Sequence, residues 1–82
     1  MEITLVEVDL RKGNGHHHPD IQIGVPYLAY IEMHIGEPPI YYTGEFDEEW
    51  YGLNFNVNGG HHFQYDQPGT NNSPWVKLWK IV

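Results

Sequence analysis

Between residues 25 and 35 an apolar side chain occupies every second position, and this period of two is the feature that most limits how the chain can fold. The row consists of Val25, Tyr27, Ala29, Ile31, Met33 and Ile35. Successive side chains of an extended chain point to opposite sides, so such a row predicts a strand with one buried face. No stretch of about eleven or more residues has the helical period, which predicts little or no helix.

The same alternation recurs elsewhere in the chain. It predicts further strands at about residues 3–10, 40–46, 49–57, 61–66 and 75–82. Asn58, Gly59 and Gly60 accept the positive φ of a tight hairpin turn between the segments on either side of them. The last segment has no clearly polar face. The first also mixes phases, as expected for a strand that carries a β-bulge or is covered on both sides.

About six short strands and no helix predict an all-β fold, a small antiparallel barrel or sandwich. A chain of 82 residues has room for one small core, so residues 1–82 are expected to form a single small β domain. A strand, a long polar loop and then consecutive hairpin strands resemble the general architecture of an SH3-like barrel. Residues 11–24 would take the place of the long first loop of that fold. The resemblance implies a fold and not a function, because small barrels carry many unrelated sites.

Acidic residues outnumber basic ones by eleven to four, which gives a formal net charge of −7. This charge opposes the counterion release on which nucleic-acid proteins depend, and it excludes general nucleic-acid binding. The chain has no cysteine, which removes disulfides, thiolate nucleophiles and cysteine-based zinc sites. Its start is unlike a signal peptide, and no apolar run approaches the roughly 20 residues that span a bilayer. We therefore expect a soluble cytoplasmic protein without a membrane partner.

Six tyrosines, three tryptophans and three phenylalanines exceed what so small a core can hide, so some aromatic surface is expected to be exposed. One stretch combines acidic and aromatic residues: Glu45, Asp47, Glu48, Glu49, Trp50 and Tyr51. Tryptophan and tyrosine are enriched at interface hot spots, and clustered carboxylates steer a cationic surface towards them. The stretch predicts a non-enzymatic binding or inhibitory module for a protein partner with a basic surface. A solvated hairpin turn with a partly buried tryptophan is the alternative interpretation.

The basic residues fall in two places only, Arg11 with Lys12 and Lys77 with Lys80. If the first and last strands pair, these residues would form one cationic patch beside the loop that contains three consecutive histidines. The candidate ligand-binding set is Arg11, Lys12, His16, His18, Asn71, Asn72, Ser73, Trp75 and Lys77. As the second candidate function, it predicts a homo-oligomer that sequesters a small, nucleotide-like anion at a subunit interface, because 82 residues enclose too little volume for a deep pocket. Solubilising lysines on a terminal strand are the simpler interpretation.

The three consecutive histidines, residues 16–18, also raise the possibility of a metal site. Zinc needs three or four ligands at fixed geometry, and neighbouring side chains diverge in an extended chain, so at most His16 and His18 share a face. Further ligands would have to come from His34, His61, His62 or Asp66. A histidine and carboxylate metal-binding protein is thus a third candidate, and a solvated polar loop is the interpretation that we favour.

The residues offer little for catalysis. Ser73 is the single serine, and it lies in a turn segment between Asn72 and Pro74 without the context of a nucleophile. The consecutive acids at residues 47–49 are expected in an exposed turn, whereas acid and base catalysis needs carboxyl groups held in a cleft with separated pKa values. We expect no enzymatic activity, no metal ligand and no cofactor.

Overall fold

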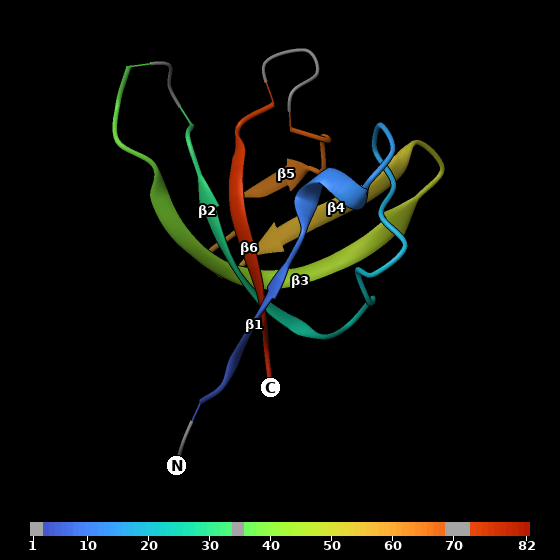
Figure 1. Ribbon diagram of the computed structural model, residues 1–82, viewed down its shortest axis with the longest axis horizontal. Helices are drawn as coiled ribbons and strands as arrows, with labels where there is room; N and C mark the ends of the chain where they lie inside the picture. Colours follow the sequence, from blue (N-terminus) through green and yellow to red (C-terminus); the bar gives the residue numbers. More distant parts are fainter. Residues whose placement is uncertain (1–2, 34–35, 69–72) are drawn as a thin grey trace.

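The computed structural model describes residues 3–33, 36–68 and 73–82, and this part of the chain is almost entirely β structure. The strands are β1 (Leu5–Val8), β2 (Pro26–Ile31), β3 (Ile40–Glu49), β4 (Gly52–Val57), β5 (His62–Gln64) and β6 (Trp75–Ile81). A single turn of 3-10 helix, η1 (Leu10–Lys12), follows β1. All strand pairs are antiparallel, in the order β1-β6-β2-β3-β4-β5 (Figure 1). The predicted antiparallel all-β fold of about six strands with little helix is confirmed.

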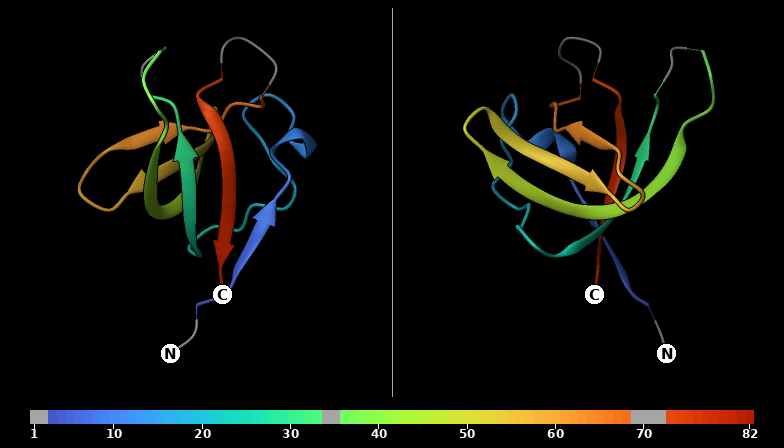
Figure 2. Two further views of the ribbon diagram at one scale, coloured as in Figure 1. Left: turned by 60° about the vertical axis from the view of Figure 1, so that its left-hand side comes forward. Right: turned by 180° about the vertical axis from the view of Figure 1, so that it is seen from behind.

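The sheet is open. β1 and β5 lie at opposite ends of the strand order, and no pairing joins them within the described residues, so the expected barrel closure and SH3-like architecture are not confirmed. β3 instead bends along its ten residues and turns β4 and β5 back towards β2 and β6 (Figures 1 and 2). Both edge strands are short, which limits the length of backbone that could pair with another chain.

The core fills the concave side of the bent sheet. Tyr27, Ala29 and Ile31 of β2 are fully buried, as the alternating row predicts. Met33, expected in the same row, is 40% exposed because β2 ends at Ile31. The centre of the core is aromatic: the Phe46 ring centroid lies 4.8 Å from that of Phe55, 5.2 Å from that of Tyr27 and 5.8 Å from that of Trp75. The core is therefore built from rings that four different strands contribute.

β6 carries a β-bulge that explains why its segment has no polar face. Trp75 and Leu78 are both buried although they are three positions apart. Along β2, Ile31 lies opposite Trp75 while the preceding Tyr30 lies opposite Lys77, so one extra residue is inserted in β6. The insertion reverses the alternation, and each face of β6 therefore receives apolar residues.

β1 differs from its prediction. It pairs with β6 in unbroken register from Leu5 opposite Ile81 to Val8 opposite Leu78, and its residues are exposed or half-buried. The prediction that it carries a bulge or is covered on both sides is therefore wrong. The mixed phase arises because the chain leaves the strand before Leu10, which enters the core from η1.

Candidate functional site

The turn between β3 and β4 presents two aromatic side chains to solvent. β3 ends at Glu49 and β4 begins at Gly52, so the predicted continuous strand over residues 49–57 is wrong at its start. Trp50 is 92% exposed, and its ring meets that of Tyr51 edge to face at 5.5 Å. Tyr51 was expected to point inward with Leu53, but at the turn it is 36% exposed. We call residues 48–53 the hairpin tip.

The acidic residues of the predicted binding stretch lie within this tip or just before it on β3, and they occupy both faces of the hairpin. All of them are exposed. Glu48 lies opposite Leu53 and shares the strand face of the buried Phe46, whereas Glu45, Asp47 and Glu49 alternate onto the other face. Asp47 accepts a hydrogen bond from the Asn56 side-chain amide on β4. The structure therefore brings the six predicted residues to one hairpin and divides their charges between its two sides.

The β4 side of the hairpin tip is fixed to the histidine loop, residues 13–19. The backbone N–H of Leu53 donates a hydrogen bond to the carbonyl oxygen of His16 at 2.8 Å. Gly52 has φ +133°, and a Cβ atom built there would lie 2.5 Å from His16, so only glycine permits this approach. The loop thus holds the hairpin tip in place.

Two of the three consecutive histidines are bound to protein groups. His18 is 6% exposed, and its Nδ1 accepts a hydrogen bond at 3.0 Å from the backbone N–H of Asp20. Its Nε2 lies 2.7 Å from the carbonyl oxygen of Asp9, an acceptor, so Nε2 carries the proton and donates. Nδ1 of His16 lies 3.0 Å from the carbonyl oxygen of Tyr65 and 2.8 Å from Asp66 Oδ1. Both rings therefore hold the loop to the rest of the fold.

We expect His18→Ala to lower the free energy of unfolding by about 1–3 kcal/mol, because it leaves a carbonyl and an N–H without their partner. His17→Ala is the control: this side chain is exposed, so its removal should change stability by no more than about 0.5 kcal/mol. Urea denaturation followed by tryptophan fluorescence measures both. Equal losses for the two variants would contradict the structural role of His18.

Tyr65 closes the loop from the core side. It is fully buried, and its O–H donates a hydrogen bond at 2.6 Å to the carbonyl oxygen of Leu10. Burial raises the pKa of Tyr65 to about 12, and the charges of Asp66 and Asp9 add to this effect. The pKa of Asp9 is lowered, chiefly by the hydrogen bond from the backbone N–H of Arg11. Tyr65 therefore stays protonated, and keeps its hydrogen bond to the carbonyl oxygen of Leu10, until the pH approaches about 12.

The pKa of Tyr65 is higher in the folded than in the unfolded state, and this difference predicts a loss of stability in alkali. Below the ordinary tyrosine pKa of 10 both the folded and the unfolded states hold the proton, so the contribution is complete. Above it only the unfolded state releases the proton, and stability should fall by up to about 1.4 kcal/mol per pH unit until the pH reaches the folded-state pKa. Denaturation series from about pH 8 to about pH 12 measure this slope. Tyr65→Phe should lack this component, so identical slopes for the variant and the original chain would contradict the assignment.

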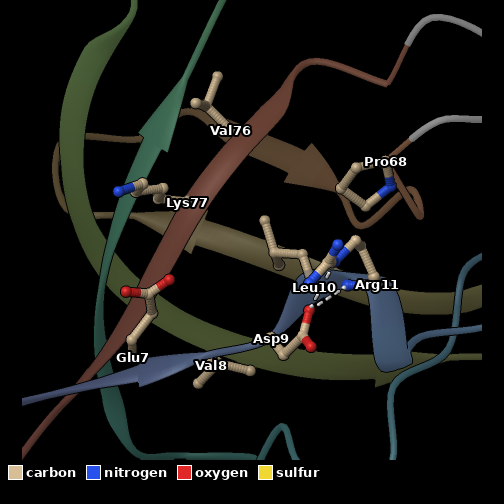
Figure 3. Close-up of a pocket in the computed structure, with 8 residues that line it drawn as sticks. All are labelled: Glu7, Val8, Asp9, Leu10, Arg11, Pro68, Val76 and Lys77. Carbon is tan, nitrogen blue, oxygen red and sulfur yellow. Dashed lines mark hydrogen bonds and ion pairs between the residues drawn. The ribbon is translucent and has the colours of Figure 1, made fainter.

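Arg11 and Lys77 of the predicted ligand set line one open groove of about 490 Å³ (Figure 3). Its lining consists of Glu7, Val8, Asp9, Leu10, Arg11, Pro68, Val76 and Lys77. The first and last strands do pair, as the prediction of a shared cationic patch required. Arg11 is already paired, however, with Nε 3.4 Å from Asp9 Oδ1, and Figure 3 shows Lys77 on the other side of the groove, where Glu7 lies. The groove therefore presents two acids and two bases.

The other members of the predicted ligand set lie elsewhere. Lys12 is exposed outside the groove lining, and the fourth base, Lys80, donates a hydrogen bond to the side chain of Gln22. Trp75 is 2% exposed in the core, where its indole N–H donates to the carbonyl oxygen of Gln64 at 2.9 Å. The Ser73 hydroxyl donates to the carbonyl oxygen of Asp66 at 2.8 Å. Asn71 and Asn72 lie outside the described residues.

Sequence reasoning missed the acids and the apolar residues of the groove. Glu7 and Val8 come from β1, and Pro68 comes from the distant segment after β5. The one signal that could have found part of this lining is the pairing of the chain ends, which sets Glu7 and Val8 opposite β6. Pro68 reaches the groove through tertiary packing alone.

No three histidine or acidic side chains gather at metal-binding distance in the part of the chain that the structure describes. Among the further ligands considered from the sequence, His34 lies outside that part. No helix of residues 3–33, 36–68 and 73–82 has the length and apolar composition needed to cross a membrane.

Fold and site together define a small antiparallel β protein with one exposed acidic and aromatic hairpin tip. Comparison of the chain with protein-family models, with curated proteins and with solved structures finds no match. The hairpin tip and the groove are therefore the features of the molecule that bear on its function.

Proposed function

We propose that this protein is a non-enzymatic binding or inhibitory module, acting in the cytoplasm, that captures a protein partner with a basic surface through its hairpin tip. The 92% exposure of Trp50 is the observation that carries the proposal. A tryptophan in this position adds nothing to the core, and tryptophan is one of the residue types enriched at interface hot spots. Its edge-to-face contact with Tyr51 presents two aromatic side chains together.

The charges around the tip favour a basic partner. Asp47, Glu48 and Glu49 are exposed, and none of them forms an ion pair with a described residue. The net charge of −7 adds long-range attraction for a cationic surface, which raises the rate of encounter at low salt. A partner that lays a basic surface over Trp50 would therefore meet carboxylates of the residues that directly precede it on β3.

The attachment of the tip to the histidine loop supports the same function. The hydrogen bond from Leu53 to His16 and the close approach at Gly52 fix the hairpin tip before any partner arrives. A fixed binding surface loses little conformational freedom on association, so more of the contact energy is available for affinity. Binding at the hairpin tip does not require the sheet to close into an SH3-like barrel.

Binding of a fluorescein-labelled, lysine-rich peptide with a few leucines tests the proposal. Trp50→Ala should weaken binding by about tenfold or more, as expected for loss of a hot spot. The control is Tyr41→Ala, because Tyr41 is also exposed, at 59%, but stacks on Tyr30 away from the tip. The affinity of Tyr41→Ala for the peptide should stay within about twofold of that of the original chain. Fluorescence anisotropy at two salt concentrations measures both, and equal affinities for the two variants would contradict the proposal.

We propose the small-ligand binder as the second candidate, because Arg11 and Lys77 line the same groove. The groove is open, and a second copy of the chain would supply the missing wall for a nucleotide-like anion. Glu7 and Asp9 in the lining oppose an anion, which places this function second. Light scattering and the shift of Tm with a panel of nucleotides test it. A monomer that no nucleotide stabilises would contradict it.

A further inference from the structure

A second cavity, of about 330 Å³, lies between the histidine loop and the hairpin. Its lining consists of Asn14, His17, His18, Pro19, Ile21, Glu48 and Leu53. Glu48 and Leu53 flank the turn that carries Trp50, so the hairpin tip forms part of the cavity wall. We call it the loop pocket. Glu48 comes from the predicted protein-binding stretch and His18 from the predicted ligand set, so the cavity joins residues of two different predicted sites.

The loop pocket combines apolar walls with one acid. Ile21 and Leu53 are 8% and 4% exposed, so their side chains form the packed part of the wall, and Pro19 extends it. Glu48 is exposed at the lining and forms no ion pair with any described residue. His17 is exposed in the lining as well, and its ring offers a flat surface. An occupant therefore needs an apolar stem and a positively charged end.

The walls of the loop pocket are formed before a ligand arrives. The backbones of Asn14 and His17 exchange two hydrogen bonds, of 2.8 Å and 3.1 Å. His18 is held at both ring nitrogens, and the backbone N–H of Leu53 is bonded to the loop. A preformed pocket binds without the cost of ordering its walls, so even one side chain of a partner can gain from it.

We infer that the loop pocket takes an arginine side chain, the anchor that a basic partner would place beside Trp50. The inference rests on the proposed function and adds to it the identity of one partner residue. Guanidinium is planar, more weakly hydrated than ammonium, able to stack on an aromatic ring and able to form two hydrogen bonds to one carboxylate. Lysine also offers an apolar stem and a positive charge, but its ammonium is more strongly hydrated, cannot stack on the ring of His17 and lacks the planar pair of donors that matches the carboxylate of Glu48.

A divalent metal fits the loop pocket less well. Its lining provides one carboxylate and two histidines, and the ring nitrogens of His18 are engaged with Asp9 and Asp20. Glu48 and His17 alone fall short of the three or four ligands that a protein zinc site uses. The charge of Glu48 also opposes an anion, which leaves a cationic side chain as the matching ligand.

Titration of the 15N-labelled protein with N-acetyl-arginine amide tests the inference, with N-acetyl-lysine amide as the comparison. The arginine compound should shift the amide signals of His17, Ile21, Glu48 and Leu53 in a saturable way. The lysine compound should bind these residues at least about threefold more weakly. Glu48→Lys should reduce the arginine affinity by about tenfold, because it replaces attraction by repulsion. Glu37→Lys makes the same change of net charge at an exposed residue that precedes β3, at the end of that strand away from Glu48, and should leave the affinity within about twofold.

Equal affinity for the two compounds, no shift at the loop pocket, or equal effects of the two glutamate variants would overturn the inference. These results are separable from failure of the proposed function. A lysine-rich peptide that loses affinity on Trp50→Ala would support the function even if the loop pocket ignores arginine. A peptide that is indifferent to Trp50 would contradict the function whatever the arginine titration gives.

Discussion

Replacement of Gly44 by alanine is expected to lower the free energy of unfolding by about 3 kcal/mol, a large share of the roughly 4–12 kcal/mol that a chain of this size has available. Gly44 of β3 lies opposite Val57 of β4. A Cβ atom there would lie 2.1 Å from the backbone carbonyl oxygen of Asn56. That oxygen belongs to the neighbouring strand, so it can move only if the pairing of β3 with β4 is disturbed.

Urea denaturation of Gly44→Ala beside Glu45→Ala measures the effect. Glu45 is the exposed neighbour of Gly44 on the same strand, and its replacement should change stability by no more than about 0.5 kcal/mol. Similar stabilities for the two variants would show that β3 and β4 are not as close as described.

Phe46→Ala is expected to cost about 3–5 kcal/mol, because it empties the centre of the aromatic core. The Phe46 ring is fully buried and contacts the rings of Tyr27, Phe55 and Trp75. Trp50→Ala removes a larger side chain from the same hairpin, yet it should change stability by no more than about 0.5 kcal/mol, since that side chain is 92% exposed. Thermal denaturation by circular dichroism compares them. A large loss for Trp50→Ala would contradict the account of the hairpin tip as a binding surface.

The alternation of residues predicted the parts of the fold in which one strand face is buried and the other is not. It identified the buried row of β2, through Tyr27, Ala29 and Ile31, because that strand is central and regular. It failed where a local event breaks the period. The inserted residue in β6 and the turn at Trp50 and Tyr51 each shift the phase, and a mixed pattern does not reveal where the shift occurs.

The candidate sites depended on contacts between distant parts of the chain. Trp50 and Trp75 are the same residue type, but one is exposed at a turn and the other packs against Phe46, Phe55 and Tyr65. The partner of His16 lies 49 residues further along the chain, at the carbonyl of Tyr65. No local pattern predicts such a contact, so the histidine loop could be described from the sequence only as polar. The acidic and aromatic hairpin was predictable because its residues are consecutive.

A basic partner that binds at the hairpin tip should perturb the backbone amides of residues 48–53. Amide chemical shifts of the 15N-labelled protein, followed as the lysine-rich peptide is added, measure this perturbation residue by residue. We expect saturable shifts concentrated at residues 48–53, with loss of these shifts in Trp50→Ala. Shifts confined to the groove of Arg11 and Lys77, or no saturable shift at residues 48–53, would contradict binding at the hairpin tip.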